Sequence, residues 1–429
     1  MSTPAPVAAP VSTPAAAAAG AQWLAPRMAV GVFLAFALAY FFSTLIRAVT
    51  ATLSPVLSAE LALSASDLGL LSGGYFLGFA LTQLPMGRWL DRYGPRRVIL
   101  AFLCVAVLGC AAFAMATQFS GLLAARVLTG MGVSACLMAP LTGYRRWLRP
   151  ELLLRANSWM LMTGSLGMVA ATLPVQWLLP VLGWRGLFWG LAALIVLSMA
   201  ALLWRVPGWP APVAAAAGET AAPVGYAQIA RHPYFRQMVG IGFVFYGGML
   251  AIQTLWAGPW LVQVTGTTAA GAAQGLFGIN LCMLVTFWLW GLLNPHLARR
   301  GWSAERLIAW GVPLALAVLA LNVVLGPQAG WPLWALFCVC ASVGALAQPA
   351  VGMALPAQAA GRALSAYNLV IFAGVFAMQW AIGLAADALA PLGWDAAQRL
   401  RGAVGLFGLA AALAYAGFWR AQRRRMAGR

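Results

Sequence analysis

The sequence contains no lysine, and its 429 residues include only eight aspartates and glutamates and two histidines. Charged residues make up 8% of the chain, whereas hydrophobic residues make up 63%. A soluble domain needs far more charge to cover its surface. The composition therefore excludes a soluble domain and predicts a protein whose solvent is largely lipid.

The six cysteines all lie in apolar stretches, and none forms the Cys-x-x-Cys spacing of a metal or redox site. We expect these thiols to be buried as small hydrophobic side chains. The sequence also lacks a nucleophile–base pair, a cluster of metal-ligating residues and a glycine loop of the kind that binds phosphate. These absences argue against an enzyme and predict no cofactor and no metal site.

The net charge of +18 is carried entirely by arginine. A strongly basic chain suggests nucleic acid, but most of these arginines lie at one end of the apolar segments, in alternate loops. That asymmetry is the positive-inside pattern of membrane proteins, which places both termini in the cytoplasm. We therefore expect no nucleic acid partner and a multi-pass protein of a bacterial-type inner membrane.

Twelve apolar segments are long enough to cross a hydrocarbon core of roughly 30 Å as helices. They lie at 28–55, 67–86, 98–116, 121–143, 156–179, 186–204, 236–263, 273–293, 304–325, 331–355, 363–386 and 400–420. The sequence predicts an all-α membrane protein with twelve transmembrane helices in two six-helix bundles. Transporters built from repeats have this arrangement.

The expected domains follow from the segments between the spans. Residues 1–27 read as a disordered cytoplasmic tail, because their first 20 residues are rich in Ala, Pro, Ser and Thr and carry no charge. An N-terminal bundle at 28–204 and a C-terminal bundle at 236–420 are joined by a Pro- and Ala-rich cytoplasmic linker at 205–235. Residues 421–429 form a basic C-terminal tail.

A charged segment at residues 87–97 separates the second and third apolar segments. It reads Gly-Arg-Trp-Leu-Asp-Arg-Tyr-Gly-Pro-Arg-Arg. Its spacing closely resembles the loop between helices 2 and 3 of the major facilitator superfamily. The resemblance implies a transporter in which this loop latches the two bundles at the inner face. The residues implied to act in gating are Gly87, Asp91, Arg92, Gly94, Arg96 and Arg97.

Two further segments support this resemblance. Residues 291–301 are a degenerate second copy of the loop, with Pro295 in the register of the aspartate. Arg126, followed by glycines at +4 and +6, resembles the superfamily's span-4 signature. The resemblance implies that Arg126 braces its helix against the first span, which places it with the gating residues; direct contact with substrate is the alternative.

Arg47 lies deep inside the first apolar segment, where a charge is costly and therefore marks a functional site. Tyr40, Ser43 and Thr44 share its helical face. A guanidinium offers a planar fork of donors suited to carboxylate or phosphate. We predict that Arg47, with Tyr40 and Thr44, binds an anionic substrate; snorkelling or pairing with helix carbonyls is the alternative.

The first segment also resembles the anion-handling branch of the superfamily, the organic-anion and sugar-acid symporters. There an arginine follows an aromatic-rich segment and precedes a proline by eight residues, as Arg47 precedes Pro55. Members of that branch carry protons on an aspartate before the arginine and a glutamate on span 4. Those positions are Ile46 and Val133 here, so the family's usual carboxylates are absent.

Polar and aromatic residues in the second half supply the other wall of the predicted substrate site. Buried amides need partners, which are either another helix or a substrate. The candidates are Gln253, Trp256, Asn280 and Asn368.

Together these features predict a secondary active or facilitative transporter that moves a small organic anion by alternating access and acts as a monomer. Efflux of amphipathic compounds is the main alternative, because the chain is rich in aromatics. A transport-inactive membrane sensor is a weaker alternative, since the termini are short and featureless.

Overall fold

The computed structural model describes residues 23–209 and 225–427, and these residues form helices joined by short turns, without a β-strand. The all-α prediction is therefore confirmed. Most of the tail expected at 1–27 lies outside the described residues, as does 210–224 in the middle of the expected linker.

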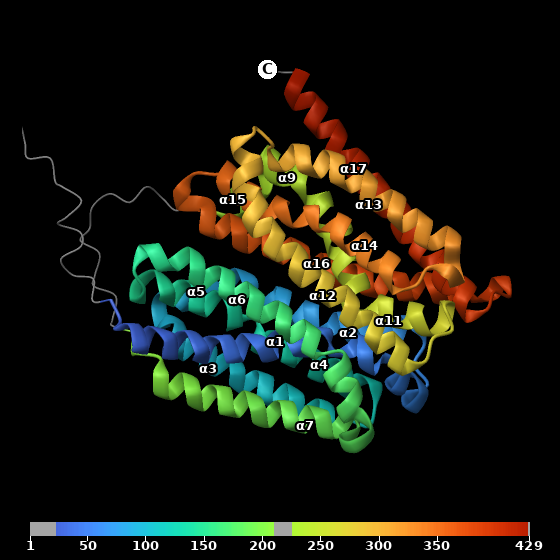
Figure 1. Ribbon diagram of the computed structural model, residues 1–429, viewed down its shortest axis with the longest axis horizontal. Coiled ribbons are helices and arrows are strands. Elements are labelled where there is room, and N and C mark those ends of the chain that lie inside the picture. The colour runs from blue at the N-terminus through green and yellow to red at the C-terminus, as the bar shows by residue number, and fades with distance from the viewer. Residues whose placement is uncertain (1–22, 210–224, 428–429) are drawn as a thin grey trace, which may run out of the picture.

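The first half of the chain forms seven helical elements. They are α1 (Pro26–Leu61), α2 (Ala65–Leu81), α3 (Gln83–Met115), α4 (Phe119–Val133), α5 (Ala135–Trp147), α6 (Pro150–Ala170) and α7 (Leu173–Arg205). In Figure 1 these helices, coloured blue to green, form the lower layer of the molecule.

The second half forms the upper layer, coloured yellow to red (Figure 1). Its α-helices are α8 (Tyr226–Arg231), α9 (Pro233–Gly240), α10 (Gly247–Ala251), α11 (Ala257–Pro259), α12 (Ala269–Arg299), α13 (Ala304–Leu325), α14 (Trp331–Ala341), α15 (Ala347–Ala354), α16 (Ala357–Ala388) and α17 (Ala396–Ala427). Three π-helical turns, η2 (Ile241–Tyr246), η3 (Ile252–Trp256) and η4 (Trp260–Val264), link α9 to α11 and extend beyond it. Short 3₁₀ turns are η5 (Gly326–Gln328), η6 (Ser342–Leu346) and η7 (Ala390–Leu392).

Among the described residues, ten helical segments are long and apolar enough to cross a membrane. The sequence predicts twelve, and all twelve ranges are helical apart from short breaks. The two segments missing from the ten are 67–86 and 156–179. The first is broken at Thr82, which leaves α2 with 17 residues, and the second is divided between α6, which has 21 residues, and the start of α7.

The charged segment 87–97 is more helical than the loop that its resemblance implies. Helix α3 runs through it, with a single non-helical residue at Gly94, where φ is +78°. Glycine adopts this conformation without the steric cost that a Cβ imposes. The chain therefore turns at one residue, and Pro95 begins the next helix with a φ that suits it. Gly183 in α7 makes the corresponding break with φ +62°.

Helix α2 joins the two halves, because it packs along α16 as well as along α4. A Cβ on Gly69 or Gly73 would collide with α16, and one on Gly78 would collide with the backbone of α4. Small residues let helices approach closely in a membrane, where apolar surface alone gives no preference for a partner helix. The glycines of the second apolar segment therefore serve both interfaces.

Large apolar side chains cover the outside of both halves. Val181, Trp204, Trp310 and Met353 each expose more than 70% of their surface. Such a surface is stable only where lipid replaces water. The chain is thus a multi-pass membrane protein.

Helices extend into the segments expected as linker and basic tail. Helix α7 continues to Arg205, the first residue of the expected linker. Tyr226 begins helix α8, and its hydroxyl donates to the Leu84 carbonyl at 3.1 Å. The described part of the expected basic tail continues helix α17 as far as Ala427. Local charge and proline content do not predict these helical extensions. The helix at Tyr226 is held by a contact with the first half, and the tail simply continues helix α17.

Candidate functional site

Arg47 lies on α1 at the junction of the two halves. Its guanidinium carbon is 5.5 Å from the ring centroid of Phe79 on α2 and 5.5 Å from that of Phe372 on α16. The two rings are themselves 4.3 Å apart between centroids. We name Phe79 and Phe372 the aromatic clamp. Because each half contributes one ring, the distance between the two rings changes whenever the halves move relative to each other.

The Arg47 charge has no carboxylate partner in the part of the chain that the structure describes. There the single ion pair joins Arg185 to Glu60, at 2.5 Å between Nη1 and Oε1. The buried Nε atom of Arg47 makes no hydrogen bond. A buried cation without a counter-ion is unfavourable, which makes Arg47 a strong candidate for binding an anion.

Three tyrosine hydroxyls lie near enough to Arg47 to interact with its charge. They belong to Tyr40 on α1, Tyr75 on α2 and Tyr246 at the end of η2. The Tyr75 hydroxyl donates to the Ser43 carbonyl at 3.1 Å. The sequence analysis predicted Tyr40 but not Tyr75 or Tyr246. A polar hydroxyl deep inside an apolar segment is the feature that could have identified both.

Thr44, the third residue predicted on this face, is engaged inside the first half. Its hydroxyl donates to the Phe41 carbonyl at 3.0 Å, and it packs against Gly167 of α6. Tyr40 also packs against α6, over Gly164. Thus Arg47 lies at the junction of the two halves, whereas Tyr40 and Thr44 on the same face of α1 pack against α6.

Three of the four predicted residues of the second half make hydrogen bonds to partners within that half. The Gln253 amide donates to Asn280 Oδ1 at 3.0 Å, and the Asn280 amide donates to the Leu276 carbonyl at 2.9 Å. Trp256 donates to the Gln379 carbonyl at 3.1 Å. These hydrogen bonds tie helices together and leave the side chains buried.

Asn368, in contrast, reaches across the junction. Its amide donates to Gln83 Oε1 on α3 at 2.7 Å, while its own oxygen accepts a hydrogen bond from Gln348 at 3.2 Å. We name Gln83, Asn368 and Gln348 the amide bridge. Gln83 follows Phe79 by one helical turn, so the bridge adjoins the aromatic clamp.

At the other end of α2, Asp387 of α16 accepts hydrogen bonds from two backbone amides. Its carboxylate oxygens lie 2.8 Å from the Ser66 nitrogen and 3.3 Å from the Ala65 nitrogen. A carboxylate at a helix N-terminus is stabilised by the free amides and the helix dipole. Asp387 therefore holds the start of α2 from the opposite half.

The side-chain contacts found for the predicted gating residues in segment 87–97 stay within the first half. Asp91 is exposed and, among the described residues, makes no hydrogen bond or ion pair. Arg92 lies over the ring of Tyr93, and Arg96 donates to the Leu203 carbonyl at 2.7 Å. The latch across the halves that the resemblance implies is thus not formed in this conformation. Gly87 and Arg97 are exposed.

Gly94 has a contact that the sequence does not show. A Cβ at Gly94 would overlap the side chain of Trp209, at the start of the expected linker. The same indole lies 5.0 Å from the Arg146 guanidinium carbon and 5.9 Å from the Trp147 ring. Gly94 is therefore required both for its positive φ and for the room that Trp209 occupies.

Arg126 is completely buried between α4 and α1. Its Nη1 donates to the Ile46 carbonyl at 3.2 Å, and its Nη2 donates to the Thr50 hydroxyl at 2.6 Å. The guanidinium also lies over the Tyr75 ring, at 5.3 Å from the centroid. These contacts tie α4 to α1 immediately beside Arg47.

Comparison with known proteins agrees with this architecture. The family model of the Major Facilitator Superfamily matches residues 36–379. The chain is 29% identical over 156 residues to the 4-hydroxybenzoate transporter PcaK of Pseudomonas aeruginosa, covering 36% of this chain and 35% of the relative. The match thus spans about a third of the relative's length.

Solved structures share the fold. A bacterial homologue of the human lysosomal transporter Spinster, in an inward-facing and unoccupied conformation, has a TM-score of 0.76 at 20% identity and covers 93% of this chain and 98% of its own. The POT family transporter PepTSo has a TM-score of 0.73 at 14% identity, covering 93% and 99%. With a family model that matches most of its length, this chain belongs to the major facilitator superfamily.

Proposed function

We propose that this protein is a secondary active or facilitative carrier of a small organic anion, and that Arg47 binds the anionic group. The observation that carries the proposal is the position of Arg47, which lies at the junction of the two halves without a carboxylate partner among the described residues. A substrate carboxylate supplies the missing negative charge and two parallel hydrogen bonds to the guanidinium.

The neighbours of Arg47 favour an aromatic acid. The rings of Phe79 and Phe372 offer apolar surface for a planar group, and the nearby tyrosine hydroxyls offer hydrogen bonds to a ring substituent. The likeness to a 4-hydroxybenzoate transporter supports the same class. We therefore take hydroxybenzoates as the first substrates to test.

Alternating access requires contacts between the halves that break and form again. The aromatic clamp, the amide bridge and Asp387 are contacts of this kind, distributed along α2 and α16. The segment 87–97 would form its latch across the halves in another conformation, in which Asp91 gains a partner that it lacks among the residues described in the present one.

The same proposal includes the placement of the protein in the membrane. Arginines gather where α1 begins, where α7 ends and in the segment 87–97, and Arg96 joins the last two of these. We assign this arginine-rich end to the cytoplasmic side of a bacterial-type inner membrane, with both termini on that side and a monomer as the transporting unit.

Uptake into proteoliposomes tests the substrate assignment. With radiolabelled 4-hydroxybenzoate, Arg47→Ala should raise the half-saturating concentration by about 30-fold or more, because a buried charge-assisted contact is lost. Arg47→Lys should recover part of that loss. The exposed Arg300 provides a matched control, and Arg300→Ala should transport normally. Equal uptake by the wild type and Arg47→Ala would exclude Arg47 as the anion site.

A competition experiment separates anion transport from efflux of amphipathic compounds. Unlabelled benzoates should inhibit uptake, whereas uncharged analogues of the same size, such as benzamides, should inhibit weakly. Inhibition by amphipathic cations but not by benzoates would favour the efflux function instead.

A further inference from the structure

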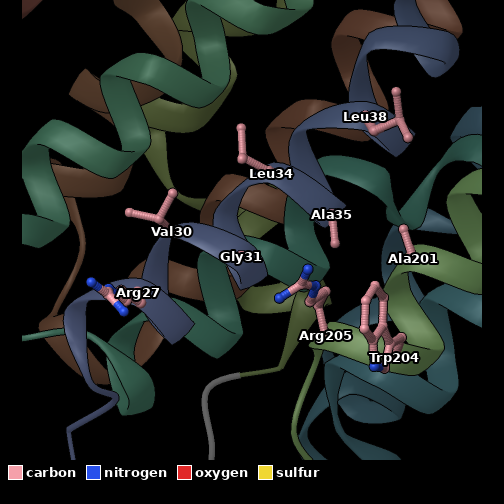
Figure 2. A pocket seen from close by; sticks show the side chains of 9 residues that line it. All are labelled: Arg27, Val30, Gly31, Leu34, Ala35, Leu38, Ala201, Trp204 and Arg205. Atoms are coloured by element: carbon pink, nitrogen blue, oxygen red, sulfur yellow. The ribbon is translucent and has the colours of Figure 1, made fainter.

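A groove between α1 and α7 opens on the outside of the first half, at the arginine-rich end (Figure 2). Its volume is about 470 Å³. It is lined by Arg27, Val30, Gly31, Leu34, Ala35, Leu38, Ala201, Trp204 and Arg205. This groove faces away from the junction of the two halves and has no part in the transport site proposed above.

Two guanidiniums occupy one end of the groove. Arg27 is the second residue of α1, and Arg205 is the last residue of α7. Arg205 extends across to α1, where a Cβ added to Gly31 would lie 3.4 Å from its Cδ atom (Figure 2). Neither arginine makes an ion pair or a hydrogen bond to another described residue, and no acidic residue lines the groove.

A third arginine adjoins this pair. A second hollow of about 380 Å³ shares Trp204 and Arg205 with the groove and is also lined by Arg96. Arg96 is fixed there by its hydrogen bond to the Leu203 carbonyl, at 2.7 Å. Three arginines therefore line two adjoining hollows at one end of the first half, and guanidiniums are suited to binding a phosphate group.

The rest of the groove is apolar and leads away from the arginines along α1. Val30 and Leu34 expose 57% and 59% of their surface, respectively, and Leu38 follows one turn later. Trp204, with 79% of its surface exposed, lies beside the charged end. A tryptophan next to arginines is typical of the level of lipid headgroups, and the apolar stretch beyond it lies at the level of acyl chains.

We propose that this groove binds an anionic phospholipid, with the phosphate between Arg27 and Arg205 and an acyl chain along Val30, Leu34 and Leu38. A soluble anion would use the arginines but not the apolar stretch, and a zwitterionic lipid would use the stretch while its own cation opposes the arginines. Basic pockets between transmembrane helices bind anionic headgroups in this way. The negative phosphate of the bound lipid offsets part of the positive charge of the two arginines, and the lipid ties the start of α1 to the end of α7.

The test uses the purified full-length protein in detergent. Dioleoylphosphatidylglycerol should bind and raise the unfolding temperature, whereas dioleoylphosphatidylcholine, with the same chains, should do so weakly. Replacing both arginines, in R27A/R205A, should weaken phosphatidylglycerol binding roughly 30-fold, because each basic residue near a headgroup changes the affinity roughly fivefold. The double variant R299A/R300A removes the same charge from the second half and should bind as the wild type does.

A second variant tests the groove without changing any charge. Gly31→Leu fills the groove where Arg205 crosses to α1 and should abolish the preference for phosphatidylglycerol while the protein still folds, since the nearest atoms to the added Cβ belong to the flexible side chain of Arg205. If R27A/R205A fails to fold, Gly31→Leu and the conservative R27K/R205K decide the matter. The proposal is overturned if the two lipids bind equally, if R299A/R300A loses as much binding, or if glycerol phosphate without acyl chains stabilises the protein equally. None of these outcomes bears on uptake by Arg47, so the two proposals fail separately.

Discussion

The amide of Asn368 on α16 donates a hydrogen bond to the side-chain oxygen of Gln83 on α3, at 2.7 Å, and links the two halves across 285 residues of sequence. Both side chains are buried, so the Asn368 amide and the Gln83 oxygen would lose this partner if the halves separated there. Such a bond favours the conformation in which it forms. The first prediction follows from it.

Replacing Gln83 or Asn368 by leucine should weaken the junction, and the two replacements together should be less than additive. The coupling free energy in a double-mutant cycle of thermal stability should be about 1 kcal/mol. Spin labels at Arg145 and Ala354, one in each half at the arginine-rich end, should report longer distances in either variant.

The pair Gln253 and Asn280 provides the control for that experiment, because it is also a buried amide pair, 3.0 Å apart, but lies within the second half. Breaking it should lower stability without changing the distance between the labels. Strict additivity of the Gln83 and Asn368 replacements would show that the bridge carries no energy.

Asp387 should hold the opposite end of the junction closed. Asp387→Asn keeps a hydrogen-bond acceptor but removes the charge that interacts with the start of α2. The population with separated labels at Ala62 and Ala390 should rise two- to fivefold, for a charge–dipole contribution of about 0.3–1 kcal/mol. Electron–electron double resonance measures this population.

Asp395→Asn is the matched control, since the Asp395 carboxylate accepts a hydrogen bond from the backbone N–H of Gln398, within its own half, at 2.7 Å. That variant should leave the distances unchanged. If Asp395→Asn moves the labels as much as Asp387→Asn does, the capping of α2 is not responsible.

Arg126 and Arg47 should respond oppositely to removal, although both are arginines inside the first half. Arg126→Ala loses two hydrogen bonds and leaves a cavity, so it should destabilise the protein by about 2–4 kcal/mol. Thr50→Val, which removes one of those bonds with little change in shape, should cost about 1.5–3 kcal/mol.

Arg47→Ala removes a charge that has neither an ion pair with a described residue nor the two hydrogen bonds that hold Arg126, so it should leave the unfolding temperature unchanged or raise it. Differential scanning fluorimetry of the three variants makes the comparison. An equal loss of stability in Arg47→Ala and Arg126→Ala would indicate that Arg47 is also a structural brace.

Gly130→Ala should destabilise the contact between α4 and α2, because its Cβ would collide with the Tyr75 carbonyl. Overpacking of this kind costs about 1–3 kcal/mol. Gly190 in α7 has open space around the same position, so Gly190→Ala should stabilise its helix by up to about 1 kcal/mol. Thermal unfolding of both variants checks the pair, and a stable Gly130→Ala variant would contradict the close packing described here.

The position of Arg47 could be predicted from sequence because a single charge in an apolar segment is a strong local signal. Phe79 and Phe372 could not, since the chain has 20 phenylalanines and nothing local distinguishes these two. Gln83 was overlooked for a related reason: its partner Asn368 lies in the other half, and only their contact sets it apart from other polar residues.

The segment 87–97 shows a similar division. Its glycine and charges predict where the chain turns, yet the turn at Gly94 needs one residue, and Trp209 packs against it from the expected linker. The sequence predicted a latch across the halves. The contacts observed are within the first half, because a latch of this kind depends on how the halves are positioned.

Hydropathy, arginine asymmetry and glycine spacing by themselves determined that this chain spans a membrane as helices in two related halves. These properties depend on the energy of moving each segment from water to lipid, which is a sum over neighbours in sequence. The tertiary structure alone decided which side chains meet across α2 and α16, and it placed Arg47 near two rings, with no carboxylate partner among the residues it describes. Such contacts depend on close packing between segments far apart in the chain, so they cannot be predicted from the properties of neighbouring residues.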